Sequence, residues 1–244
     1  MAVKIHTMTY FYVILVLLTG YVYELFYFYI CLVIHECGHI VFIKLMGKKI
    51  DTLEISPIGG ILLIDETQND HNYKSFLIYL GGPLFSLLLF LWVKNTFSNP
   101  LFLQASFVIL VLNLIPILPL DGGRLVESLL HNVVWYKLAT KVVFIASIIM
   151  LAILLFFIRD NYIYSGIIVF FIFKNLEGYK NINYDYHHFR MVKYLYPNPL
   201  LNIKVIEKDY YTRLYKGYNN YYYHNNKLIS EEKMLKTLLN SNND

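Results

Sequence analysis

The residues best suited to chemistry are two histidines and a glutamate in an otherwise apolar segment. His35, Glu36 and His39 form a His-Glu-x-x-His pattern between Ile30 and Phe42. Because four residues are slightly more than one helical turn, both imidazoles would project from one face of a helix and could bind a single Zn²⁺. Glu36 would lie beside them, where a carboxylate can act as general base. The pattern therefore predicts a hydrolytic zinc site.

Two imidazoles leave a zinc site incomplete, and the sequence offers a carboxylate as the third ligand. Asp121 lies in the stretch from Asn113 to Arg124, in which two prolines interrupt a helix and two glycines permit unusual backbone angles. Interrupted backbone at membrane depth is tolerated only where it is buried in protein or lines a watery cavity. We therefore predict that Asp121 completes the zinc site, towards the cytosolic side of the membrane.

The elements that position these residues belong to a membrane protein. Of 244 residues, 57% are apolar and only 16% are charged. The 40 Phe and Tyr residues exclude disorder for most of the chain, and two cysteines, Cys31 and Cys37, are too few for a disulfide scaffold. A net charge of +4 does not indicate a nucleic-acid partner.

Apolar segments long enough to cross a bilayer predict about six transmembrane helices. The first two could form a single helix of about 35 residues, but this is twice the length needed and a hairpin is favoured. The last segment is short, so five spans are the alternative. The predicted spans are residues 9–23, 24–46, 75–93, 101–117, 137–158 and 161–174.

Basic residues predict the orientation of these spans. With six spans, both termini share a side with the loops at 44–75 and 118–137, and that side holds 18 of the 21 Lys and Arg residues. Because cytosolic segments carry such an excess, both termini should be cytosolic. Five spans would place the basic tail opposite the basic loops. The first span follows Lys4 without a small-residue cleavage pattern, so we expect a retained anchor.

Two segments outside the spans have patterns of their own. Leu53 to Ile64 is typical of strand, turn and strand, which predicts a small membrane-associated β-hairpin whose edge could pair with an extended substrate. Residues 177–244 are rich in Tyr, Asn and Lys, with predicted strands followed by a helix from Ser230. The predicted fold is thus an all-α polytopic membrane domain, residues 1–176, with a small α+β C-terminal cytosolic domain, residues 177–244.

In these motifs the chain resembles the site-2-type intramembrane zinc metalloproteases, and in particular their sporulation branch, which processes pro-sigma-K. The likeness rests on Asn-x-x-Pro-x-x-Pro-Leu-Asp-Gly-Gly, on Gly81-Gly82-Pro83, and on the lack of an insertion large enough for a PDZ domain. It implies zinc ligation by His35, His39 and Asp121, with Glu36 as the catalytic base. It also implies substrate-binding or supporting roles for Asn113, Pro57, Gly59 and Gly60.

The resemblance also implies partners and a location. It predicts an intramembrane endopeptidase in the bacterial inner membrane, with one Zn²⁺ as cofactor and a membrane-associated sporulation pro-sigma factor as substrate. Inhibitory membrane proteins are further expected partners, and nucleic acid is not. The C-terminal module would be CBS-like, which makes ATP a candidate ligand although no phosphate-binding glycine loop is present.

Other interpretations stay open at this point. The chain could cleave anti-sigma factors or signal-peptide remnants, although the missing PDZ insertion disfavours this. It could also be an inactive membrane scaffold or a metal-handling protein, but such a site needs no base and Glu36 is intact. Asn113 could support the site or hydrogen-bond between helices. Many relatives carry Asn where this chain has Ser86, so we assign Ser86 no role.

Overall fold

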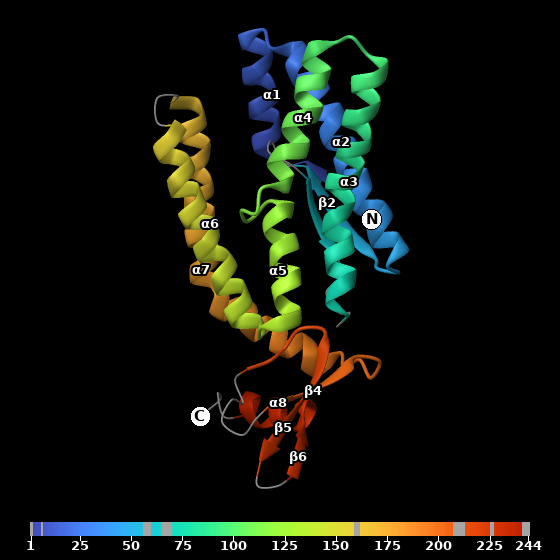
Figure 1. The fold of residues 1–244 in the computed structure, drawn as a ribbon, viewed down its shortest axis with the longest axis vertical. Coiled ribbons are helices and arrows are strands. Elements are labelled where there is room, and N and C mark those ends of the chain that lie inside the picture. Colours follow the sequence, from blue (N-terminus) through green and yellow to red (C-terminus); the bar gives the residue numbers. More distant parts are fainter. Residues whose placement is uncertain are drawn as a thin grey trace. The chain divides into compact units, whose positions relative to one another are not determined.

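The computed structural model describes residues 2–5, 7–55, 60–64, 70–158, 162–206, 213–224 and 227–240 (Figure 1). The chain divides into two compact units. The first comprises residues 1–65, 77–115 and 120–122, and the second comprises 66–76, 116–119 and 123–244. Two helices, α3 (Asn72–Thr96) and α5 (Asp121–Val133), contribute residues to both units.

The first unit is built on apolar helices. It contains α1 (Thr7–Thr19), α2 (Val22–Leu45), α4 (Pro100–Leu114) and most of α3. Gly20 separates α1 from α2 with a φ of 81°, a left-handed conformation that ends a helix, so the predicted break between the first two segments is confirmed. Its core comprises Cys31, Leu32, Leu89, Val93, Phe102 and Ile109.

A three-stranded sheet completes this unit. Strands β2 (Ile50–Ile55) and β3 (Gly60–Ile64) are antiparallel, with Ile55 opposite Gly60, which confirms the predicted hairpin. Strand β1 (Ala2–Ile5), which we did not predict, pairs in parallel with β2. The order β1-β2-β3 leaves β3 at an edge. Pro57 and Gly59 lie outside the described residues.

Helices α2 and α3 approach each other closely at two glycines. A Cβ atom on Gly38 would lie 2.3 Å from the carbonyl oxygen of Gly81, so only glycine fits there. The motif Gly81-Gly82-Pro83 is typical of close helix packing combined with the start of a helix. The packing is present, but Pro83 lies inside α3, which begins at Asn72. Residues 72–80 are also helical, so the helix begins upstream of this motif.

The second unit contains α6 (Tyr136–Ile158) and α7 (Tyr162–Leu195), which pack along each other. Segment 118–137, expected to be a loop, contains the 13-residue helix α5. The composition change after residue 176 falls inside α7, whose buried residues Ile182, Tyr186 and Arg190 follow a helical spacing beyond it. The change therefore marks the end of an apolar segment and not of a helix. The division into two domains after residue 176 stays a prediction.

The C-terminal part of this unit has the predicted strands and helix. Strand β4 (Asn202–Ile206) is parallel to β5 (Tyr218–His224), which is antiparallel to β6 (Lys227–Ser230). Helix α8 (Glu231–Asn240) follows directly after Ser230. The sheet and helix enclose a small core of Leu214, Tyr222, Met234 and Leu235, to which Tyr186 of α7 also belongs.

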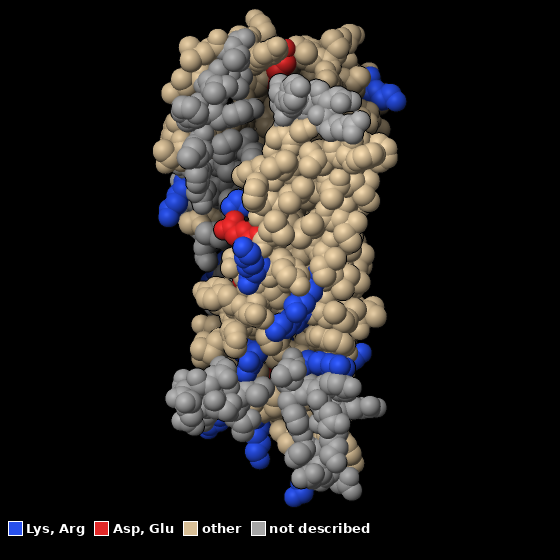
Figure 2. Space-filling view, turned by 90° about the vertical axis from the view of Figure 1, so that its left-hand side faces the viewer, with Lys and Arg blue, Asp and Glu red and all other residues tan. Residues whose placement is uncertain are grey.

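The helices identify an integral membrane protein. Among the described residues, α2, α3 and α6 are long and apolar enough to span a bilayer, and the apolar helix α4 is shorter, at 15 residues. Helix α6 buries small or polar residues such as Ala139 and Ser147, while Ile145, Ile149 and Phe156 are exposed on its surface. Figure 2 shows a broad surface without charged side chains. Such large apolar surfaces fit contact with lipid.

Candidate metal centre

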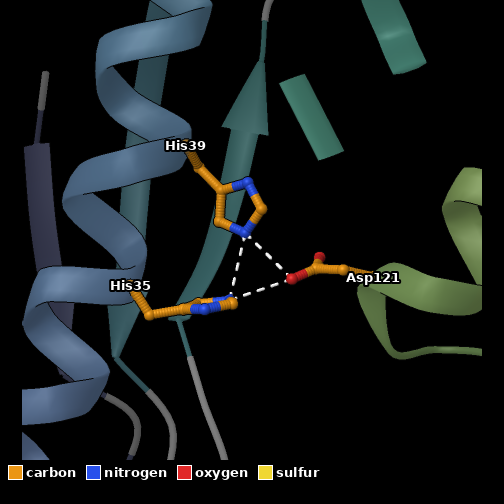
Figure 3. Close-up of side chains that lie close together, drawn as sticks. All are labelled: His35, His39 and Asp121. Carbon is orange, nitrogen blue, oxygen red and sulfur yellow. Dashed lines mark hydrogen bonds and ion pairs between the residues drawn. The ribbon is translucent and has the colours of Figure 1, made fainter. Parts of the chain in front are cut away.

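Three side chains from distant parts of the sequence converge on one point in the first unit (Figure 3). Asp121 Oδ2 lies 2.9 Å from His35 Nε2 and 3.1 Å from His39 Nε2. The two Nε2 atoms are 3.2 Å apart. The structure thus brings together the three residues that the sequence predicts as metal ligands, and among the described residues they form the one cluster of this kind.

Helix α2 presents both histidines from one face, as their spacing predicts. They are almost fully buried, with exposed fractions of 2% for His35 and 6% for His39. Each ring is held through its other nitrogen: His39 Nδ1 donates to the carbonyl of Ile78 and His35 Nδ1 lies against the hydroxyl of Ser86, both at 2.8 Å. These contacts turn both Nε2 atoms towards Asp121.

Asp121 is positioned by an interruption between two helices. Helix α4 ends at Leu114 and α5 begins with Asp121, so the carboxylate stands at a helix N-terminus. The interrupting segment lies directly against the first turn of α5. A Cβ atom on Gly122 would be 2.3 Å from the carbonyl oxygen of Ile115, and one on Gly123 would be 2.6 Å from the backbone of Leu118. These glycines are therefore needed for close approach, and not for the unusual backbone angles that the sequence suggested.

The geometry and the donor set both fit zinc. Ligand atoms about 2.0–2.1 Å from a tetrahedral Zn²⁺ are about 3.3 Å apart, close to the separations of 2.9–3.2 Å between the three atoms here. Two imidazoles and a carboxylate leave a fourth position for water, as in catalytic zinc sites. Helix α3 also leaves space, because a Cβ atom on Gly82 would lie 2.3 Å from His39 Nε2 and 2.6 Å from His35 Nε2.

For the other predicted site residues that the structure describes, it gives a position but does not test a role. Glu36 is half-buried on α2, next to His35. The side-chain amide of Asn113 donates to the carbonyl of Ile109 in its own helix at 3.0 Å, and within the described part of the chain no hydrogen bond joins it to the three converging residues. Gly60 begins β3. The roles of these three residues remain predictions.

Two residues at the site were missed by sequence reasoning. Ser86 was left without a role, yet its hydroxyl contacts His35. Gly82 was given no role at the site, yet it borders both Nε2 atoms. The spacing Ile78, Gly82, Ser86 is a signal that could have found them, since positions four apart share one face of a helix.

Comparison with known proteins gives consistent results. The sequence matches peptidase family M50 over residues 23–98 and 93–157. It is 31% identical over 125 residues to zinc metalloprotease MJ0392 of Methanocaldococcus jannaschii, covering 47% of this chain and 36% of that protein. It is 27% identical over 207 residues to stage IV sporulation protein FB of Bacillus subtilis, covering 78% and 71%.

The fold is similar to a solved structure as well. The site-2 protease from Methanocaldococcus jannaschii matches with a TM-score of 0.56 and 26% identity, over 72% of this chain and 90% of that one. The sequence match with MJ0392 spans only about a third of that protein's length.

Proposed function

Since the chain belongs to peptidase family M50 and has a site-2 protease fold, we propose that it is an intramembrane zinc endopeptidase that hydrolyses a peptide bond of a membrane-associated protein. The observation that carries this proposal is the convergence of His35, His39 and Asp121 on one point. All three offer lone pairs there, and a divalent cation is the group that satisfies such a set.

Glu36 supplies the proton chemistry. When bound, zinc would act as a Lewis acid and lower the pKa of a water molecule from 15.7 to about 7. Glu36 follows His35 on α2, and a carboxylate beside the ligands can take a proton from the attacking water. It then gives that proton to the leaving amide nitrogen as the peptide bond breaks. His35, His39 and Asp121 would hold the metal throughout.

We further propose that the substrate binds as an added strand. A helical substrate must unwind before hydrolysis because its carbonyls are hydrogen-bonded within the helix. Strand β3 pairs with β2 and stands at the edge of its sheet, so its outer side can accept an extended peptide. Single proline substitutions along Ile61 to Ile64 should reduce cleavage, and full activity in all of them would exclude strand addition.

The proposed substrate is a sporulation pro-sigma factor, and inhibitory membrane proteins are proposed partners. The support is the likeness to a protein named for stage IV of sporulation, which extends over 78% of this chain. Cleavage of anti-sigma factors or signal-peptide remnants is the alternative within the class. ATP binding by the C-terminal module has no support in the described contacts.

The proposed topology has six spans, with both termini on the cytosolic side of a bacterial inner membrane. The charge distribution supports it, because 18 of the 21 basic residues then face the cytosol. Labelling of single introduced cysteines at Lys94 and in the C-terminal module should give opposite accessibility in intact cells. Equal accessibility would contradict six spans.

Reconstitution tests the activity. The purified full chain, in lipid vesicles with a candidate pro-sigma factor, should produce a shortened product. Cleavage should stop on addition of a zinc chelator and return when zinc is restored. Glu36→Gln should give no product while still binding zinc, which would exclude a metal-handling protein because such a site needs no base. Unchanged cleavage by Glu36→Gln would contradict the proposed mechanism.

A further inference from the structure

Both histidines of the metal centre are oriented by one neighbouring helix. On α3, the backbone carbonyl of Ile78 contacts His39 and the side chain of Ser86 contacts His35. Gly82 lies midway between them in sequence and borders both Nε2 atoms. Positions 78, 82 and 86 are each four residues apart, so they lie on one face of α3, the face towards α2.

The two contacts differ in what they require of the imidazole. A carbonyl can only accept a hydrogen bond, so His39 carries a proton on Nδ1, and in the neutral ring Nε2 then carries a lone pair. A hydroxyl can donate or accept, so the tautomer of His35 depends on how Ser86 is used. Both Nε2 atoms can ligate one cation only if the proton of His35 is also on Nδ1.

We propose that Ser86 is a positioning residue for the metal centre: its hydroxyl accepts a hydrogen bond from His35 Nδ1 and keeps Nε2 directed at the point that His39 and Asp121 also face. This inference rests on the proposed function. It gives a role to a residue that acts through His35.

Burial supports a specific role for this contact. Ser86 is 2% exposed and His35 is 2% exposed, so water does not compete for the Nδ1 proton. The nitrogen and oxygen are 2.8 Å apart. If Ser86 is removed, the buried Nδ1 proton loses its partner and the ring gains freedom to rotate or to change tautomer. Partners of this kind typically contribute about 10–100-fold to metal affinity.

The test measures zinc affinity of the purified full chain in detergent by competition with a chromophoric chelator. Ser86→Ala should bind zinc about 10–100-fold more weakly than wild type. Ser86→Thr, which keeps a hydroxyl, should restore most of the affinity. Ser106→Ala is the matched control, because Ser106 is 1% exposed in the same unit but bonds to Leu103 in its own helix. It should bind zinc as wild type does.

A second readout separates positioning from packing. The visible spectrum of the Co²⁺-substituted protein reports ligand geometry and should change in Ser86→Ala but not in Ser106→Ala. Melting temperatures in excess chelator should fall by similar amounts in both variants. If Ser86→Ala binds zinc within twofold of wild type and gives an unchanged Co²⁺ spectrum, the inference is wrong. If wild type and His35→Ala both fail to bind zinc, the proposed function itself fails.

Discussion

Two buried polar clusters, one in each unit, differ in how their charges are balanced. In the second unit, Lys193 of α7 donates to both carboxylate oxygens of Glu231, at 2.7 and 2.9 Å, and to the carbonyl of Tyr218 at 2.7 Å. The backbone and side-chain amides of Asn220 also donate to Glu231, at 2.7 and 2.8 Å. This cluster contains its own cation.

The cluster in the first unit has the opposite character. The ligand atoms of His35, His39 and Asp121 converge at 2.9–3.2 Å from one another. Nδ1 of His39 donates to the carbonyl of Ile78, and in our proposal Nδ1 of His35 donates to Ser86. A cluster that supplies its own counter-charge needs no ligand, whereas two imidazoles and a carboxylate that converge on one point have the donor set of a catalytic zinc site. Burial alone does not separate the two cases, because both are largely enclosed.

The largest expected effect is on the rate of catalysis by the cluster in the first unit. Glu36→Gln should lower the rate of peptide hydrolysis by a factor of about 10²–10⁴ or more, since the general base is lost. Zinc stoichiometry should stay at the wild-type value because Glu36 is not one of the three converging residues. Gel analysis of product formation measures the hydrolysis rate, and elemental analysis measures the zinc stoichiometry. Parallel loss of zinc would mean that Glu36 is a ligand.

Filling the space beside the candidate metal centre should weaken zinc binding. Gly82→Ala places a Cβ atom 2.3 Å from His39 Nε2, so one or both rings must move. We expect zinc affinity to fall by at least about 100-fold, the upper end of the cost of losing an outer partner. Alanine also favours a helix over glycine by about 1 kcal/mol, so α3 itself should not be weakened. If Gly82→Ala binds zinc with wild-type affinity, the two histidine rings can move aside without loss of the metal.

Breaking the self-balanced cluster should affect stability and not zinc. Lys193→Met leaves the carboxylate of Glu231 buried without its counter-ion, and we expect a loss of about 3–5 kcal/mol in the free energy of unfolding. The double variant Lys193→Met, Glu231→Leu should recover much of this. Denaturant unfolding in detergent measures both. A drop in zinc affinity in the single variant would contradict the separation of the two clusters.

A third buried histidine shows that burial does not make a ligand. His131 of α5 stacks on Tyr136 with ring planes 4° apart, and burial together with the nearby Lys216 lowers its pKa to about 3, while Glu127 opposes the change. In the unfolded chain the pKa of His131 is near 6.5, so between about pH 3 and pH 6.5 this side chain binds more protons in the unfolded state than in the folded state. The contribution of His131 to stability is therefore full above pH 6.5 and falls as the pH decreases.

The expected size of this effect is about 2 kcal/mol between pH 7 and pH 5. Melting temperatures across this range should fall in the wild type and fall less in His131→Phe, which keeps the stacking on Tyr136. Equal slopes in the two proteins would show that another group causes the pH dependence.

The smallest expected effect concerns the hydrogen bonds of Asn72 at the start of α3. Asn72 donates to the side chain of Asn132 at 3.0 Å and to the carbonyl of Lys216 at 2.9 Å, and Gly217 packs against it with a φ of 74°. Asn72→Ala should cost about 1–2 kcal/mol of unfolding free energy and leave zinc affinity unchanged. Gly217→Ala, which collides with Asn72, should behave similarly. Loss of zinc in either variant would link these hydrogen bonds to the metal centre.

The parts of the molecule that were predictable are those with local signals. The spacing of His35 and His39 fixes one helix face, and Asp121 lies in an interrupted stretch that is rare at membrane depth. The hairpin of β2 and β3 follows from a strand pattern around two glycines. In each case the signal and the structure occupy the same few residues.

The parts that were missed depend on partners far along the chain. Ser86 contacts a residue 51 positions away, so its role depends on the packing of α3 against α2. Strand β1 pairs with residues 52–55, and four N-terminal residues carry no sign of this. The extent of α7 was hidden because its continuous apolar run ends near residue 176 while the helix continues to Leu195.

X-ray absorption at the zinc edge of the purified, active chain tests the central claim most directly. The account predicts one zinc per chain, bound by two imidazole nitrogens at about 2.0–2.1 Å and by oxygen at about 2.0–2.2 Å. Cys31 and Cys37 lie on the same helix as the histidines, so a sulfur ligand would be visible at about 2.3 Å. A sulfur shell, or active protein without zinc, would contradict the account.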